Sequence, residues 1–183
     1  MSAGIPRPWI RDLLQLKRTP RAGWFRAGVR RPESVADHGF SMALLAWRIA
    51  RDVPGLDASR VVLMTLLHDF HEARLTDLPT PAKKYLPKGA VEEAERRIVA
   101  EQSDPDDRAV SLIAEFVAGR TAEAKLAQAV DHLEFLLQAE AYREAGHRLT
   151  EPMLRRAKEG AAWSHPVTRP WAEEIVGALA ADS

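Results

Sequence analysis

Apolar side chains recur every three to four residues along most of this sequence, which is the spacing of an amphipathic α-helix. Period-two alternation, the pattern of a half-buried strand, is not evident in any run long enough to predict one. Short stretches with proline and glycine separate the helical segments. The 183 residues therefore predict one all-α domain in which helices pack on one another.

Local signals place the ends of several predicted helices. Ser34 is a candidate N-cap with Asp37 three residues later, and Asp57 is a candidate cap of the following helix. That following helix is apolar on nearly every side, so we expect it at the centre of the fold. Residues 18–32 are predicted as a basic loop, and residues 78–81 as a break. The predicted helices cover residues 9–16, 34–52, 57–69, 90–102, 106–118, 121–146, 152–163 and 170–180.

Composition excludes several classes of function. The chain has 26 Lys and Arg and 26 Asp and Glu, so its formal net charge is zero, whereas a nucleic-acid binder usually carries a basic excess. It has no cysteine, which excludes disulfides, thiol nucleophiles and cysteine-held metal sites. The N-terminus lacks the apolar core of a signal peptide, and no apolar stretch is long enough to span a bilayer. We therefore expect a cytoplasmic protein with neither a nucleic-acid polymer nor a membrane as partner.

Three predicted helices each bring an imidazole or a carboxylate to an apolar face. His38 lies on the apolar face of its helix, His68-Asp69 ends the most apolar helix, and Asp131 borders the apolar face of the longest one. Glu72 follows one turn beyond His68. Burying such groups is costly unless they are paired or bind a metal. A metal site is one interpretation, and hydrogen-bonded or salt-bridged core residues are the other; the spacing alone leaves both open.

The same residues, taken with their neighbours, resemble a known family. His38, then His68-Asp69, then Asp131 is similar to the H…HD…D signature of HD-domain phosphohydrolases. The match is closer still to the HD-domain 5′-deoxynucleotidases, and it covers about residues 10–145. The helices at 150–181 are predicted to be appended to this core within a single HD domain, 1–183. The matching stretches are residues 16–24, 32–38, 68–72, 76–81, 123–125, 131, 134 and 138–142.

The resemblance implies a metal-dependent reaction. It implies an HD-domain helical bundle that hydrolyses deoxyribonucleoside 5′-monophosphates to deoxynucleoside and phosphate, as a homodimer. It also implies one divalent cation, with Co, Mn, Mg, Fe, Ni or Zn as candidates. The residues that match the metal ligands of the family are His38, His68, Asp69 and Asp131. Four protein ligands leave up to two positions of a six-coordinate metal for water and a phosphate oxygen.

Further residues match the family's catalytic and nucleotide-contacting positions. Glu72 and Asp77 match acidic active-site positions. We expect Glu72 to orient or deprotonate the attacking water, and Asp77 to accept a hydrogen bond from the sugar 3′-hydroxyl. Arg18 and Arg21 lie in the basic loop, and one of them is expected to meet the phosphate. Trp24 of the same loop either stacks on the base or anchors the loop to the core.

Two other functions are compatible with these residues. Other HD proteins cleave deoxynucleoside triphosphates, cyclic nucleotides or alarmones, and the ligand spacing does not fix the leaving group. The second alternative is an inactive helical metal-binding module. Loss of a ligand would be its mark, yet all four ligand positions are filled in this sequence.

Overall fold

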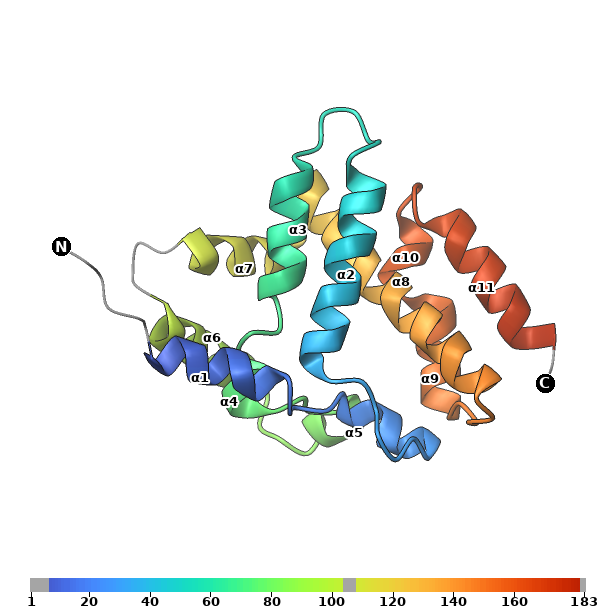
Figure 1. Ribbon diagram of the computed structural model, residues 1–183, viewed down its shortest axis with the longest axis horizontal. Helices are drawn as coiled ribbons and strands as arrows, with labels where there is room; N and C mark the ends of the chain where they lie inside the picture. The colour runs from blue at the N-terminus through green and yellow to red at the C-terminus, as the bar shows by residue number, and fades with distance from the viewer. Residues whose placement is uncertain (1–6, 104–107, 182–183) are drawn as a thin grey trace.

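A computed structural model describes residues 7–103 and 108–181, and these residues form helices and no strand (Figure 1). The all-α prediction is therefore confirmed. No helix among them combines the length and the apolar character needed to cross a membrane. The elements are α1 (Arg7–Leu16), the 3₁₀ helix η1 (Ala22–Ala27), α2 (Val35–Ala50), α3 (Ala58–Leu67), α4 (Glu72–Leu75), α5 (Thr80–Lys83), α6 (Ala90–Gln102), α7 (Arg108–Ala118), α8 (Ala122–Glu144), α9 (Glu151–Glu159), α10 (Ala161–Ser164) and α11 (Arg169–Ala181).

Two predicted caps fix the starts of α2 and α3. Ser34 Oγ accepts a hydrogen bond from the Asp37 backbone N–H, and the Asp37 carboxylate accepts one from the Ser34 N–H at 2.9 Å. This is the reciprocal capping box that the sequence predicts. Asp57 caps α3 by accepting from the Arg60 backbone N–H at 3.0 Å. The capping box fixes where α2 begins, and it therefore places His38 in the first turn of that helix.

The centre of the fold is α8, and the expectation that α3 would lie there is wrong. In Figure 1, α2 and α3 stand side by side in front of α8, and all three helices contact one another. The large apolar side chains of α8 that are fully buried include Leu126, Val130, Leu133 and Leu136. One side of α3 carries exposed apolar side chains, and so does the neighbouring helix α2. We call these exposed side chains the α2–α3 apolar face; its residues are Phe40, Leu44, Trp47, Leu63 and Leu66.

The predicted helix over residues 152–163 is in fact two helices, α9 and α10, separated at Gly160. The backbone of Gly160 is extended, and a Cβ added there would lie 2.1 Å from the ring of His132 on α8. His132 donates from Nε2 to the carbonyl of Arg156 at 2.7 Å and accepts at Nδ1 from the N–H of Ala162 at 3.3 Å. One histidine ring therefore holds both short helices against α8, and glycine leaves room for it.

Short helical turns account for the other differences from the sequence predictions. The loop predicted over residues 18–32 contains η1, and α5 begins inside the predicted break, with Pro81 in its first turn. Proline fits there because the N–H it lacks would have no partner inside the helix. Residues 106–107, where a helix was predicted to begin, lie outside the described residues; α7 is described from Arg108.

Candidate metal centre

The first turn of α2, the end of α3 and the middle of α8 bring the four predicted ligands together. Ligand atoms of His38, His68 and Asp131 all lie within 4.8 Å of one another. Oδ2 of Asp69 lies 3.0 Å from Nε2 of His68 and 3.9 Å from Nε2 of His38. Two imidazoles and two carboxylates form a donor set that suits a divalent cation.

Both histidines are held at Nδ1, which leaves Nε2 facing the cluster. Nδ1 of His38 lies 2.6 Å from Oε2 of the buried Glu134, and Nδ1 of His68 lies 2.9 Å from the carbonyl oxygen of Thr65. Since these partners accept, each Nδ1 carries a proton, and each Nε2 would offer its lone pair to a bound metal. Metal-ligating histidines are usually oriented in this way by a carboxylate or a backbone carbonyl.

Two buried polar atoms at the cluster have no hydrogen-bond partner among the described residues, Nε2 of His38 and Oε2 of Glu72. The nearest carboxylate oxygen of Asp131 is 3.3 Å from His38 Nε2. An unpaired buried polar atom costs about 1–3 kcal/mol, and a cation held between these groups would satisfy both. The residues present therefore fit a divalent metal.

The two ligand carboxylates remain ionised although burial alone would raise the pKa of each. At Asp69, the charge and hydrogen bonding of His68, aided by Arg21, hold the pKa well below its usual range. At Asp131, the contact with His38 does the same. Negative charge beside imidazole nitrogens that face the cluster is the electrostatic condition that a cation site requires.

Glu72 lies beside the predicted ligands, but its pKa is raised, whereas the pKa values of Asp69 and Asp131 are lowered. Ligand atoms of Asp69, His71 and Glu72 all lie within 4.8 Å of one another. Burial, followed by the charges of Asp69 and Asp77, raises the pKa of Glu72 to about 9. A divalent cation would favour the ionised form, so the state of Glu72 depends on whether the site is loaded.

The segment that leads to Asp77 is strained. Thr76 ends α4 with φ 67° and ψ 164°, a conformation that is rare for a β-branched residue. Asp77 is half-buried and close enough to contribute to the pKa of Glu72. Strain of this kind concentrates at functional sites, which agrees with a working role for this segment.

Only one of the two candidate arginines of the basic loop meets the cluster. Nη1 of Arg21 donates to Oδ2 of Asp69 at 3.2 Å, and the Arg21 side chain is 11% exposed. Arg18 is exposed and makes no side-chain hydrogen bond or ion pair with any residue that the structure describes. The arrangement thus favours Arg21 as the phosphate contact.

Trp24 anchors the loop to the core. Its indole is 2% exposed, stacks on Phe135 with centroids 5.2 Å apart, and meets Tyr142 edge-on. Nε1 of Trp24 donates to Oε1 of Glu33 at 2.9 Å. The buried ring leaves no open face for a nucleotide base, so the structure favours the anchoring alternative over base stacking.

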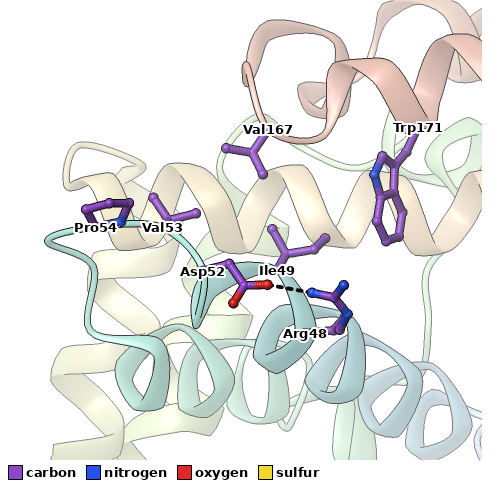
Figure 2. Close-up of a pocket in the computed structure, with 7 residues that line it drawn as sticks. All are labelled: Arg48, Ile49, Asp52, Val53, Pro54, Val167 and Trp171. Atoms are coloured by element: carbon purple, nitrogen blue, oxygen red, sulfur yellow. Dashed lines mark hydrogen bonds and ion pairs between the residues drawn. The ribbon is translucent and has the colours of Figure 1, made fainter.

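A cavity of about 300 Å³ lies apart from this cluster, where the end of α2 meets the C-terminal helices (Figure 2). Ile49, Val53, Val167 and Trp171 give it an apolar lining, and the ion pair of Arg48 and Asp52 at 2.6 Å borders it. It shares no residue with the ligand cluster. The cluster has its own access to solvent, because the side chains of Asp69 and Asp131 are 20% and 27% exposed.

Comparison with known proteins identifies the family. The HD domain family matches residues 13–161, which extends beyond residue 145 and includes α9. The 5′-deoxynucleotidase HDDC2 of Homo sapiens is 37% identical over 147 residues, covering 76% of this chain and 69% of the relative. A conserved hypothetical protein from Pyrococcus furiosus has a similar structure, with a TM-score of 0.78 and 29% identity over 94% of this chain and 98% of its own. A predicted metal-dependent phosphohydrolase from Magnetospirillum magnetotacticum gives a TM-score of 0.64 and 25% identity over 93% of each chain. The chain therefore belongs to the HD-domain phosphohydrolases, and within them to the 5′-deoxynucleotidase family.

Proposed function

We propose that this protein is a metal-dependent 5′-deoxynucleotidase that removes the phosphate from deoxyribonucleoside 5′-monophosphates. The observation that carries the proposal is the convergence of His38, His68, Asp69 and Asp131 beside the acidic Glu72, in a chain of this family. A divalent cation bound by the four ligands would lower the pKa of a bound water and polarise the phosphoryl group.

The surrounding side chains supply the remaining parts of the reaction. Arg21 exchanges its contact with Asp69 for the phosphate oxygens, which its planar fork can bind in pairs. Glu72 takes a proton from the attacking water as the new P–O bond forms. The bond between phosphorus and the sugar 5′-oxygen breaks, and Glu72 returns the proton to that oxygen. Asp77 holds the sugar by its 3′-hydroxyl.

The substrate assignment predicts discrimination between sugars. A pocket closed around the 2′-carbon leaves an added 2′-hydroxyl without a partner, and this costs about 1–3 kcal/mol. We expect kcat/KM for deoxyribonucleoside monophosphates to exceed that for ribonucleotides by at least ~10-fold. Asp77→Ala is expected to weaken nucleotide binding and to retain the metal.

The measurement is phosphate release from matched deoxy and ribo monophosphates, with each of Co, Mn, Mg, Fe, Ni and Zn in turn. Deoxynucleoside triphosphates and cyclic nucleotides belong in the same panel. Equal kcat/KM for the two sugars would leave a general nucleotide phosphohydrolase. Turnover confined to triphosphates or cyclic nucleotides would favour the other HD-domain reactions.

We also propose that two copies pair through the α2–α3 apolar face. Phe40 is 63% exposed, Leu44 55% and Trp47 52%, and exposed apolar patches of this kind mark interaction surfaces. Leu63 and Leu66 extend the face onto α3. Since α2 also carries His38, pairing would hold the helix that supplies a metal ligand.

The oligomeric state tests this pairing. Light scattering during gel filtration is expected to give twice the 20.4 kDa chain mass, and Trp47→Glu is expected to return it to one chain because a charge would be buried in the interface. Val117→Glu is the matched control, since Val117 is 70% exposed on α7. A wild-type protein that elutes as a monomer at micromolar concentration would contradict the proposal.

A further inference from the structure

Arg156 of α9 lies against the metal cluster, although it belongs to the part of the chain that was predicted to be appended. Its Nη2 lies 3.7 Å from Oδ2 of Asp131. Its Cζ lies 4.5 Å above the ring of Phe135, a cation–π contact. The backbone carbonyl of Arg156 accepts from His132 at 2.7 Å, which fixes α9 at this point. The C-terminal segment thus contributes a cation to the site.

The guanidinium of Arg156 has its hydrogen-bonding capacity free. A separation of 3.7 Å is too long for a hydrogen bond, and within the described part of the chain no acceptor receives one from this side chain. Its planar fork of five N–H donors suits phosphate or carboxylate oxygens. The cation–π contact with Phe135 places the guanidinium near Asp131 before a ligand binds.

The position of Arg156 also matches the open side of the cluster. Arg156 is 43% exposed and Asp131 is 27% exposed, so both border the side from which a substrate can approach. On the other ligand carboxylate, Asp69, the equivalent place is taken by Arg21. Each ligand carboxylate therefore has one arginine beside it, and one of the two arginines comes from outside the basic loop.

We propose that Arg156 binds the phosphate of the nucleotide together with Arg21. This inference rests on the proposed function, because it takes a phosphate monoester as the ligand of the cluster. A phosphate held next to Asp131 lies within reach of the Arg156 fork, and two arginines neutralise a dianion better than one. The charge of Arg156 lies beside Asp131 before the substrate arrives, so the cation is already in place.

The test compares Arg156→Ala and Arg156→Lys with the neighbouring variant Arg155→Ala. Arg155 is 62% exposed and pairs with Glu151 on the same helix at 3.6 Å, so it is a matched arginine without access to the cluster. None of the three variants removes the carbonyl that accepts from His132. Calorimetry measures the affinity of the metal-loaded protein for inorganic phosphate, and metal content and KM for a deoxynucleotide are measured alongside.

We expect Arg156→Ala to weaken phosphate binding and to raise KM by about 10-fold or more, the loss typical of a charged hydrogen bond. Arg156→Lys recovers part of the affinity, because it keeps the charge without the fork. Arg155→Ala behaves as the wild type, and all variants retain the metal.

Wild-type phosphate affinity in Arg156→Ala would overturn the inference. Loss of metal from Arg156→Ala would also overturn it, because Arg156 would then act on the ligand Asp131 and not on the phosphate. Phosphate binding is measured without turnover, so the two proposals fail separately. A wild-type protein that binds phosphate through Arg156 yet hydrolyses no deoxynucleotide would refute the proposed function alone.

Discussion

Replacing Asp69 by alanine is expected to abolish both metal binding and hydrolysis. Asp69 is the carboxylate nearest to His68, and it also pairs with Arg21. Its removal takes away a charged ligand and leaves the mostly buried guanidinium of Arg21 without its partner. The positive charge of Arg21 would then repel the metal. We expect elemental analysis to find no bound metal in Asp69→Ala, and a phosphate-release assay to find no turnover.

Glu72→Gln separates loss of the ligand set from loss of the proton acceptor. The amide has the size of the carboxyl group, and the raised pKa of Glu72, about 9, means that the fold already tolerates an uncharged group there. This variant is expected to keep its metal and to lose on the order of 10²-fold in kcat, the usual scale for a general base. Loss of the metal from Glu72→Gln would show that Glu72 is itself a ligand. For Asp69→Ala, full metal occupancy with normal turnover would refute the metal centre.

Among the glycines that the structure describes, Gly160 is the one where an added methyl group is expected to cause the largest loss of stability. The new Cβ would lie 2.1 Å from the His132 ring. The ring cannot retreat without breaking its bonds to Arg156 and Ala162. Overpacking of this kind costs about 1–3 kcal/mol, and each broken bond to a buried group adds to it. Denaturant unfolding followed by circular dichroism measures the change.

Gly177→Ala is the control for this substitution. Gly177 lies inside α11 with no atom within 4 Å of an added Cβ, so alanine there is expected to stabilise the helix by about 0.5–1 kcal/mol. The two variants add the same methyl group and should shift the free energy of unfolding in opposite directions. A Gly160→Ala protein as stable as the wild type would show that His132 does not hold α9 and α10 in the way described.

Features that depend on neighbours in the sequence could be predicted from it. Ser34 and Asp57 mark the starts of α2 and α3 because a cap bonds to a backbone N–H only three residues away. The break at Gly160 could not be predicted, since its cause is the ring of His132, which belongs to another helix. The placement of α3 was wrong for a related reason: apolar residues on every side do not reveal whether the fold or a second chain covers them.

In the candidate site too, residues with a local signal could be predicted from the sequence, and residues placed by another helix could not. His38 could be singled out from the sequence, because histidine is a common metal ligand and this one lies on the apolar face of its predicted helix. Glu134 gave two usable signals, because it matches a position of the family and follows Asp131 by three residues on a largely buried helix, yet its partner His38 is on α2. Arg156 gave none: it stands among other charged residues of a short helix, and only the docking of α9 brings it to the cluster.

Asp131, His132, Glu134 and Phe135 lie close together on α8, and they connect the candidate metal centre to the packing of the fold. They contribute a predicted metal ligand, the attachment of α9 and α10, the orientation of His38, and the ring that packs against Trp24 and Arg156. A metal bound at this helix would therefore stabilise the native state as a whole, because unfolding α8 would release it. Removal of the metal would thus lower the stability of the folded chain as well as its turnover.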